Sequence, residues 1–358
     1  MSQALLQVAD DFTASLFAHY GPVESRDVSL RPLRNALVTP RRFPAEGEIS
    51  GAVHDEAGAL LRSSLRVLDG DLTPVDPDHA TGADRADARP IARALYGGTL
   101  YMALGHLLFE TMARLWPLVD LERRRSGPDG LRIVFHPSPG LHMRAFFKRP
   151  MFRRTLAAFG IRPADIVLAD QPLRVGLLLY PEPLAVYHGY THPLMSEVFD
   201  HLGAALGRAD RLGPRLMPAR AERAARVFLS RSRWRHEVRI ANEAELEEMF
   251  RARGFAVVHP QDLPPHELVQ TLQAAAVVAA SDGTHAHLAA FCGPGTGMLL
   301  LDTRPVPTQV AIARMRGLRA LHLPVYINPE GIWNEETRRL DPGPLGAFVD
   351  LALETRLL

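Results

Sequence analysis

Short apolar runs alternate with amphipathic segments throughout the second half of the chain, and this rhythm narrows the possible folds more than any other feature. The runs expected to form strands are residues 227–229, 255–258, 276–280, 298–301 and 320–325. The segments with helical spacing that follow them are residues 243–253, 265–274, 284–291, 308–316 and 345–354. Strands that alternate with helices pair in parallel through crossovers, so the pattern predicts an α/β fold with helices on both faces of a parallel sheet.

The first half of the chain is less regular. Residues 48–53 and 59–67 predict a hairpin, and the Asp-, Pro- and Gly-rich residues 69–90 predict a surface loop. Helical spacing of apolar side chains predicts helices at residues 101–119, 143–159 (ending at Gly160, a C-terminal cap) and 193–206. Shorter apolar runs predict strands at residues 133–135, 166–168 and 175–179.

The length of 358 residues is sufficient for two domains. Residues 207–224 interrupt the periodicity and form the expected boundary. We therefore predict an α/β domain at residues 1–210, a Rossmann-like domain at 211–341 and a C-terminal helix at 342–358.

Composition excludes several classes of protein. The 41 basic residues balance 40 acidic ones, which argues against a broad basic surface for nucleic acid. Cys292 is the single cysteine, so an intrachain disulfide and a zinc site built from several cysteines are excluded. Neither a P-loop nor a G-x-S-x-G elbow occurs. The N-terminus has no signal-peptide pattern, and we expect a cytoplasmic protein, with peripheral membrane association and homodimer formation left open.

Polar residues follow the predicted strands of the second half. They are Ser230-Arg231, His259-Pro260, Ser281-Asp282-Gly283 and Asp302-Thr303-Arg304. The carboxyl ends of parallel strands share one edge of a sheet, where helix N-termini present free N–H groups to anions. These turns should therefore line one crevice.

Within residues 226–250, two arginines flank a helix start. Asn242 is expected to be the N-cap of that helix, with Glu245 as its capping-box partner. Arg231 and Arg239 could clamp a nucleotide diphosphate there, and a solvated loop is the competing interpretation.

The segment 277–296 runs from a strand of small residues into Asp282-Gly283 and a helix that begins near Thr284. Gly283 would let backbone approach a phosphate or sugar closely. His285 and His287 are two residues apart and point to different helix faces, so they are poorly placed to chelate one metal ion. A histidine in such a position is more often a core or capping residue than a ligand. The several glycines of a dinucleotide fingerprint are missing, which weakens an NAD site.

His106 and Glu110 are four residues apart in a predicted helix, with Arg114 one turn further on. Such a stripe is either a solvated face or a candidate acid/base pair. The Asp69–Asp71 and Asp76–Asp78 motifs match a loose metal-binding D-x-D pattern, which arises readily by chance.

Together these constellations resemble glycosyltransferase family 61, which includes bacterial capsular polysaccharide proteins and plant xylan transferases. The matching elements, in order, are GHLLFETMARLWPL at 105–118, Ser230-Arg231, Arg239, Asn242-Glu243 and a Gly-Phe segment from 254. The likeness extends from about residue 95 to about residue 300. Asp282 stands where the family usually has a histidine before the glycine, and no asparagine follows.

The resemblance implies a GT-B-like fold, with two Rossmann-like domains facing a central crevice and the donor held mainly by the second. It also implies inverting transfer without a metal ion or other cofactor, from a UDP-sugar to a glycan or lipid-linked acceptor. His106 or Glu110 would then be the base, and fixed cations would stabilise the leaving diphosphate. The residues expected to bind the donor are Arg231, Arg239, Asn242, Glu243, Asp282, Gly283, Thr284, His285 and His287.

Two other functions stay open at this point. A nucleotide-sugar-binding or assembly protein of a polysaccharide locus without turnover is one, because of the departure at Asp282. A nucleotide-dependent epimerase or dehydrogenase is the other, although the poor glycine fingerprint counts against it.

Overall fold

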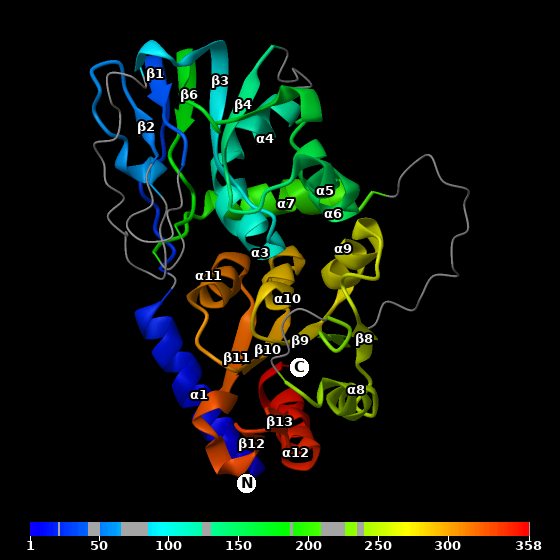
Figure 1. Ribbon diagram of the computed structural model, residues 1–358. Coiled ribbons are helices and arrows are strands. Elements are labelled where there is room, and N and C mark those ends of the chain that lie inside the picture. Colours follow the sequence, from blue (N-terminus) through cyan, green and yellow to red (C-terminus); the bar gives the residue numbers. More distant parts are fainter. Residues whose placement is uncertain are drawn as a thin grey trace, which may run out of the picture. The chain divides into compact units, whose positions relative to one another are not determined.

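The computed structural model describes the chain in eight stretches. They are residues 1–20, 22–41, 51–65, 85–123, 130–186, 189–208, 226–234 and 240–357. Two compact units result: an N-terminal unit of residues 24–202, and a C-terminal unit of residues 1–23 and 203–358 (Figure 1). Arg239, the two D-x-D motifs and most of the expected boundary at 207–224 lie outside the described residues.

The C-terminal unit contains the parallel sheet that the sequence predicts. Its strands are β7 (Arg226–Leu229), β8 (Ala256–Val258), β9 (Val277–Ser281), β10 (Gly297–Asp302) and β11 (Arg319–Pro324). They lie in the order β11-β10-β9-β7-β8, and each neighbouring pair is parallel. Each of the five predicted strands overlaps one of these, because each strand is a short run of mostly apolar residues that is evident in the sequence.

Helices cover both faces of this sheet. They are α8 (Glu243–Arg251), α9 (Pro265–Ala274), α10 (Thr284–His287), α11 (Pro307–Arg316) and α12 (Pro342–Ala352). Since β8 lies on the opposite side of β7 from the later strands, right-handed crossovers place α8 on one face and α9, α10 and α11 on the other. A short β12–β13 hairpin (Trp333–Asn334 and Arg339–Leu340) precedes α12.

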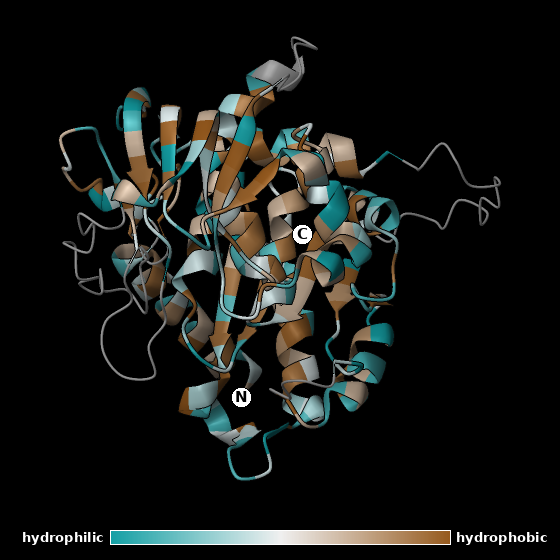
Figure 2. Ribbon diagram, turned by 45° about the horizontal axis from the view of Figure 1, so that its top comes forward, coloured by the Kyte–Doolittle hydropathy of each residue, from teal (hydrophilic) through white to brown (hydrophobic). Residues whose placement is uncertain are grey.

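Helix α1 (Ser2–His19) belongs to the C-terminal unit, although the predicted division assigned residues 1–210 to the first domain. Leu5, Leu6 and Ala9 share a core with α8, α12 and the strands. Figure 1 shows α1 beside β11, and Figure 2 shows hydrophobic residues concentrated along the strands. The observed division differs from the expected one because the apolar side chains of α1 pack against residues more than 200 positions away in the sequence.

The N-terminal unit has a six-stranded mixed sheet. Its strands are β1 (Leu30–Val38), β2 (Val53–His54), β3 (Arg89–Leu100), β4 (Arg132–Pro137), β5 (Ile166–Leu168) and β6 (Leu173–Pro181). Their order is β2-β1-β6-β3-β4-β5, with β6, β3, β4 and β5 mutually parallel and β1 antiparallel to both its neighbours. This sheet is therefore not the purely parallel one expected of a second Rossmann-like domain.

Several predicted elements of this unit are wrong in detail. The helix expected at 101–119 is instead α3 (Leu104–His106), a π-helical turn at Leu107–Thr111, a 3-10 turn at Met112–Arg114 and then α4 (Trp116–Arg123). The helix at 143–159 is divided into α5 (Met143–Lys148) and α6 (Pro150–Ala157), because Pro150 cannot continue the first. The helix predicted at 193–206, by contrast, is confirmed as α7 (Leu194–Leu206).

The predicted hairpin at residues 48–67 is reduced in the described part to a short antiparallel contact around the turn at residues 55–58. Val53–His54 pairs with β1, and only a single bridge joins His54 to Leu60. Arg62–Ser64 is a 3-10 turn whose Ser64 hydroxyl accepts from the Val53 amide. No helix among the described residues is long and apolar enough to cross a membrane.

Candidate active site

The strand order of the C-terminal unit creates a topological switch point. The chain goes from β7 outward to β8, then returns to the other side of β7 for β9. The turns that leave β7 and β9 therefore lead to opposite faces of the sheet, and α/β sheets of this order bind ligands at the carboxyl ends of two such strands. Arg231 follows β7, Asp282 and Gly283 follow β9, and Arg231 Nη1 donates to the Asp282 carbonyl oxygen at 3.0 Å.

Two carboxylates of α8 hold the turn after β7. Glu243 Oε1 accepts from the Arg231 amide at 2.7 Å, and Glu247 Oε1 accepts from the Ser230 hydroxyl at 2.7 Å. Ser232 also donates to Glu247. Arg231 is thereby fixed at both its amide and its guanidinium, with 7% of its surface exposed. This turn presents a cation that is already oriented.

The same two carboxylates have opposite titration behaviour. Burial raises the pKa of Glu243 to about 7, although the Arg231 amide and charge oppose the rise. Burial also acts to raise the pKa of Glu247, but hydrogen bonds from Ser232 and Ser230 and one from Arg251 bring it below its usual value. Glu247 therefore holds its charge near neutral pH, whereas Glu243 titrates there.

Asp282 connects the turn after β9 to the turn after β10. Its Oδ1 accepts from the amide and the hydroxyl of Thr303 at 2.8 and 2.6 Å, and the residue is fully buried. Gly283 follows with φ of 109°, a conformation that glycine adopts without strain. The aspartate at this position thus fixes the geometry of the glycine turn.

His285 and His287 are both buried in the short helix after this turn, and Thr284 is partly exposed. Burial, followed by the charge of Arg231, lowers the pKa of His285 to about 3. His285 is therefore neutral near pH 7 and can offer a hydrogen bond but not a positive charge. The Trp234 ring packs edge-on against it, with 6.1 Å between ring centroids.

Several buried polar atoms at this edge of the sheet have no hydrogen-bond partner among the described residues. They are Ser281 Oγ, His285 Nδ1, Asp302 Oδ1, Thr308 Oγ1 and Gln309 Oε1. They come from the ends of β9 and β10 and from the short helix and first turn of α11 that follow. Because an unsatisfied buried polar group costs about 1–3 kcal/mol, this edge is suited to a polar ligand.

Asn242 precedes α8 as expected, but it makes no side-chain cap bond. Its amide instead forms two bonds with the backbone of Leu340, at 2.8 and 3.0 Å, and donates to Glu245 at 3.0 Å. The capping-box prediction is wrong because the Asn242 side-chain amide bonds to the backbone of β13 instead. Asn242 therefore anchors the start of α8 to the β12–β13 hairpin.

The N-terminal unit brings His106 and Glu110 together. His106 Nδ1 contacts Glu110 Oε1, and the Tyr101 hydroxyl donates to Glu110 Oε2 at 2.8 Å. The His106 ring also stacks on the Tyr101 ring, with centroids 5.0 Å apart. A carboxylate only accepts hydrogen bonds, so a neutral His106 in this contact carries its proton on Nδ1 and leaves Nε2 as an acceptor.

Arg114 does not continue this stripe. The π-helical turn that carries Glu110 changes the helical spacing, and Arg114 is buried beneath it. Its guanidinium donates to the carbonyl oxygens of Pro181 and Ser63 and lies over the ring of Tyr96.

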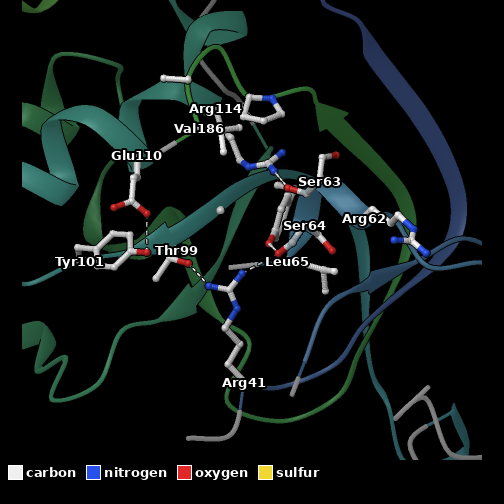
Figure 3. Close-up of a pocket in the computed structure, with 14 residues that line it drawn as sticks. Arg41, Arg62, Ser63, Ser64, Leu65, Thr99, Tyr101, Glu110, Arg114 and Val186 are labelled. Atoms are coloured by element: carbon white, nitrogen blue, oxygen red, sulfur yellow. Dashed lines mark hydrogen bonds between the residues drawn. The ribbon is translucent and has the colours of Figure 1, made fainter. Parts of the chain in front are cut away.

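Glu110 lines a cavity of about 100 Å³ within the N-terminal unit (Figure 3). Arg41, Tyr96 and Arg114 also line it, and sequence reasoning assigned no role there to Arg41 or Tyr96. The available signal was Gly97-Gly98: β3 and β4 change register between Tyr96 and Thr99, and Gly98 has φ of 77° with Arg114 against it. Paired glycines inside a strand are typical of a bulge.

The sequence of the chain also matches the model of a known protein family. The model described as Glycosyltransferase 61 matches residues 104–299, more than half of the chain. The protein belongs to glycosyltransferase family 61. No curated protein matches the chain.

The family match begins at α3 and ends within β10, so it includes both His106–Glu110 and the switch point of the parallel sheet. A family 61 glycosyltransferase requires a nucleotide-sugar donor and an acceptor. Arg41, the turn at Arg62–Ser64 and α11 lie outside the matched residues. Within the described residues, no group of three or more His, Cys, Asp or Glu side chains could hold a metal ion.

Proposed function

We propose that this protein is an inverting, metal-independent glycosyltransferase that transfers a sugar from a UDP-sugar to a glycan or lipid-linked acceptor in the synthesis of a polysaccharide such as a capsule. We further propose a GT-B-like enzyme, in which the C-terminal unit binds the donor and the N-terminal unit supplies the base and the acceptor site.

One observation chiefly supports the donor site: Arg231 and Gly283 lie in the turns that follow β7 and β9, the two strands on either side of the switch point. Arg231 would neutralise the diphosphate as it departs, in the place that a metal ion takes in other enzymes. Gly283 and Thr284 would contact the nucleotide-sugar through backbone and hydroxyl groups, and the unpartnered atoms of Ser281 and Gln309 would bond its hydroxyl groups.

Glu243, Asp282 and Asn242 contribute to this site by holding its turns, since each is occupied by backbone or threonine groups. His285 would contribute a neutral hydrogen bond, and His287 packs in the same short helix. Arg239 lies outside the described residues and stays a proposed second cation of the clamp.

For the acceptor, we assign the base to the His106–Glu110 pair. Nε2 of His106 would accept the proton of the attacking hydroxyl, and Glu110 would fix the tautomer and stabilise the imidazolium that forms. The hydroxyl oxygen then bonds to the anomeric carbon from the face opposite the leaving diphosphate, which inverts the configuration.

A thermal-shift comparison of UDP, GDP, CMP and dTDP tests the donor assignment, with UDP expected to give the largest stabilisation. Hydrolysis of UDP-sugars tests turnover, and it is measured as the release of UDP. The same measurement with and without EDTA tests metal independence. Equal rates with EDTA and with added Mn²⁺ are expected. A rate that EDTA abolishes and Mn²⁺ restores contradicts metal independence, and an inactive protein that binds UDP supports a non-catalytic binding protein instead.

A further inference from the structure

Two arginine side chains are buried at the cavity of the N-terminal unit. Arg41 is 9% exposed and Arg114 is 6% exposed. Figure 3 shows both guanidinium groups reaching the Ser63–Ser64 segment. Arg41 donates to the carbonyl oxygen of Ser64 at 2.7 Å and to the Thr99 hydroxyl, whereas Arg114 donates to the carbonyl oxygen of Ser63.

Neither guanidinium has a carboxylate partner among the described residues, and Arg41 Nε is buried without any hydrogen bond. Burying a cation that is compensated only by neutral carbonyl and hydroxyl groups is costly. In most proteins such a cation is paired or is held for a ligand.

The other titratable groups that the structure describes around these arginines do not supply the missing negative charge. Burial, then the charges of Arg41 and Arg114, shifts the pKa of His136 well below its usual value, so this histidine is neutral. Burial raises the pKa of Tyr96 against the opposing effect of the two arginines, so its hydroxyl is also neutral. Glu110 carries the remaining charge at the cavity, and it already accepts from Tyr101 and contacts His106.

Arg62, which is exposed, adds a third cation to the lining. The cavity of about 100 Å³ holds roughly three water molecules at about 30 Å³ each, which is enough for one oxyanion and the ring carbon that bears it. Planar guanidinium groups favour carboxylate and phosphate.

We infer that this cavity binds an anionic group, a carboxylate or a phosphate, carried by a sugar of the acceptor. Glu110 lines the same cavity, so a sugar anchored by its charged group has its hydroxyl groups near the acid/base pair. The acceptor role rests on the proposed function, whereas the anion site itself does not.

Calorimetric titration of the full chain with glucuronic acid, glucose 6-phosphate and glucose tests this site without any donor. We expect the anionic sugars to bind at least about tenfold more tightly than glucose, in a salt-sensitive manner. The anionic sugar that binds more tightly shows whether the cavity prefers a carboxylate or a phosphate. Equal affinity for glucose and both anionic sugars overturns the inference.

Variants locate the binding. Arg41→Gln should weaken anionic-sugar binding about tenfold or more, and the exposed Arg62→Ala by several-fold. Arg34→Ala, an exposed arginine on β1, is the matched control and should change nothing. If Arg41→Gln fails to fold by circular dichroism, Arg62→Ala and the salt dependence decide. An unchanged affinity in Arg62→Ala together with salt-independent binding overturns the site.

Binding that Arg231→Ala abolishes would place the anion in the C-terminal unit and also overturn this inference. The outcome is separable from that of the proposed function. If the protein binds glucuronic acid but never turns over a donor, the anion site is supported and the proposed glycosyltransferase activity is contradicted. If the protein transfers sugar equally well to neutral and anionic acceptors, the proposed activity is supported and the anion site is overturned.

Discussion

The two units keep their polar groups in different places. In the C-terminal unit the parallel strands are mostly apolar, apart from the buried His322 of β11, which bonds to Asp302 at the end of β10. Other polar residues, such as Arg231 and Asp282, begin where the strands end. In the N-terminal unit, Tyr96, His136 and Tyr180 are fully buried within the strands themselves, beside two buried arginines.

This difference has a physical cause. A parallel sheet covered by helices on both faces has no water on either face, so polar groups are favoured only at its ends. The mixed sheet of the N-terminal unit contains a bulge at Gly97-Gly98, and the 3-10 turn at Arg62–Ser64 supplies carbonyl oxygens that accept hydrogen bonds from the two buried arginines but do not neutralise their charge. The first arrangement suits a nucleotide at a strand end, and the second suits a charge held in an interior cavity.

The largest effect is expected at the acid/base pair of the N-terminal unit. His106→Ala should lower the transfer rate by about 10²–10⁴-fold with unchanged UDP affinity, because the proton acceptor is lost. Glu110→Gln should lower it less and change its pH profile. His142→Ala, an exposed histidine of the same unit, is the control. Full activity in His106→Ala with none in Glu110→Gln would make Glu110 the base.

The packing of α1 tests whether the units are as distinct as their cores indicate. Leu5 is fully buried among residues of the C-terminal unit, so Leu5→Ala should destabilise that unit by about 2–5 kcal/mol. Hydrogen exchange should show lower protection in β10 and β11 and none of this loss in β3 and β6. Gln3→Ala, on the exposed side of the helix, is the control, and equal loss in both units would contradict the division.

Glu243 gives the C-terminal unit a pH dependence. Because its pKa is raised in the folded protein to about 7, its contribution to stability is fully present below its ordinary value near 4.5 and is lost as pH rises through 7. The change amounts to about 3 kcal/mol. Glu243→Gln should flatten this decline in thermal unfolding between pH 5 and 8, whereas the exposed Glu248→Gln should retain it. A Glu243→Gln profile that parallels the unsubstituted protein would show that another group titrates.

The smallest effect concerns the donor side. Arg231→Ala should weaken UDP binding by about 10–100-fold, the loss of one or two charge-assisted hydrogen bonds. Arg233→Ala removes a neighbouring arginine that is exposed and paired with Asp262, and should leave UDP affinity unchanged. Equal UDP affinity in the two variants would show that Arg231 does not bind the donor.

The sequence anticipated the C-terminal sheet well because each strand and the helix after it are neighbours in the chain. It anticipated the N-terminal unit less well. Strands β1 and β3 are absent from the sequence interpretation: β1 contains Pro32 and a positive-φ Asn35, and β3 contains Gly97-Gly98, so neither shows a regular alternation. Their pairing with β6 depends on contacts far apart in the chain, which local patterns do not encode.

By itself, the sequence determined the α/β class, the turns that follow the parallel strands and the four-residue spacing of His106 and Glu110, since all three depend on residues close together in the chain. The tertiary structure alone decided which polar groups are already engaged. It assigned Asn242 to Leu340 and Asp282 to Thr303, bonded Arg114 to backbone carbonyl oxygens, and brought Arg41 to the same short segment as Arg114. Hydrogen-bond partners and burial are set by segments that meet only on folding, and they decide whether a charged side chain supports the fold or remains available to a ligand.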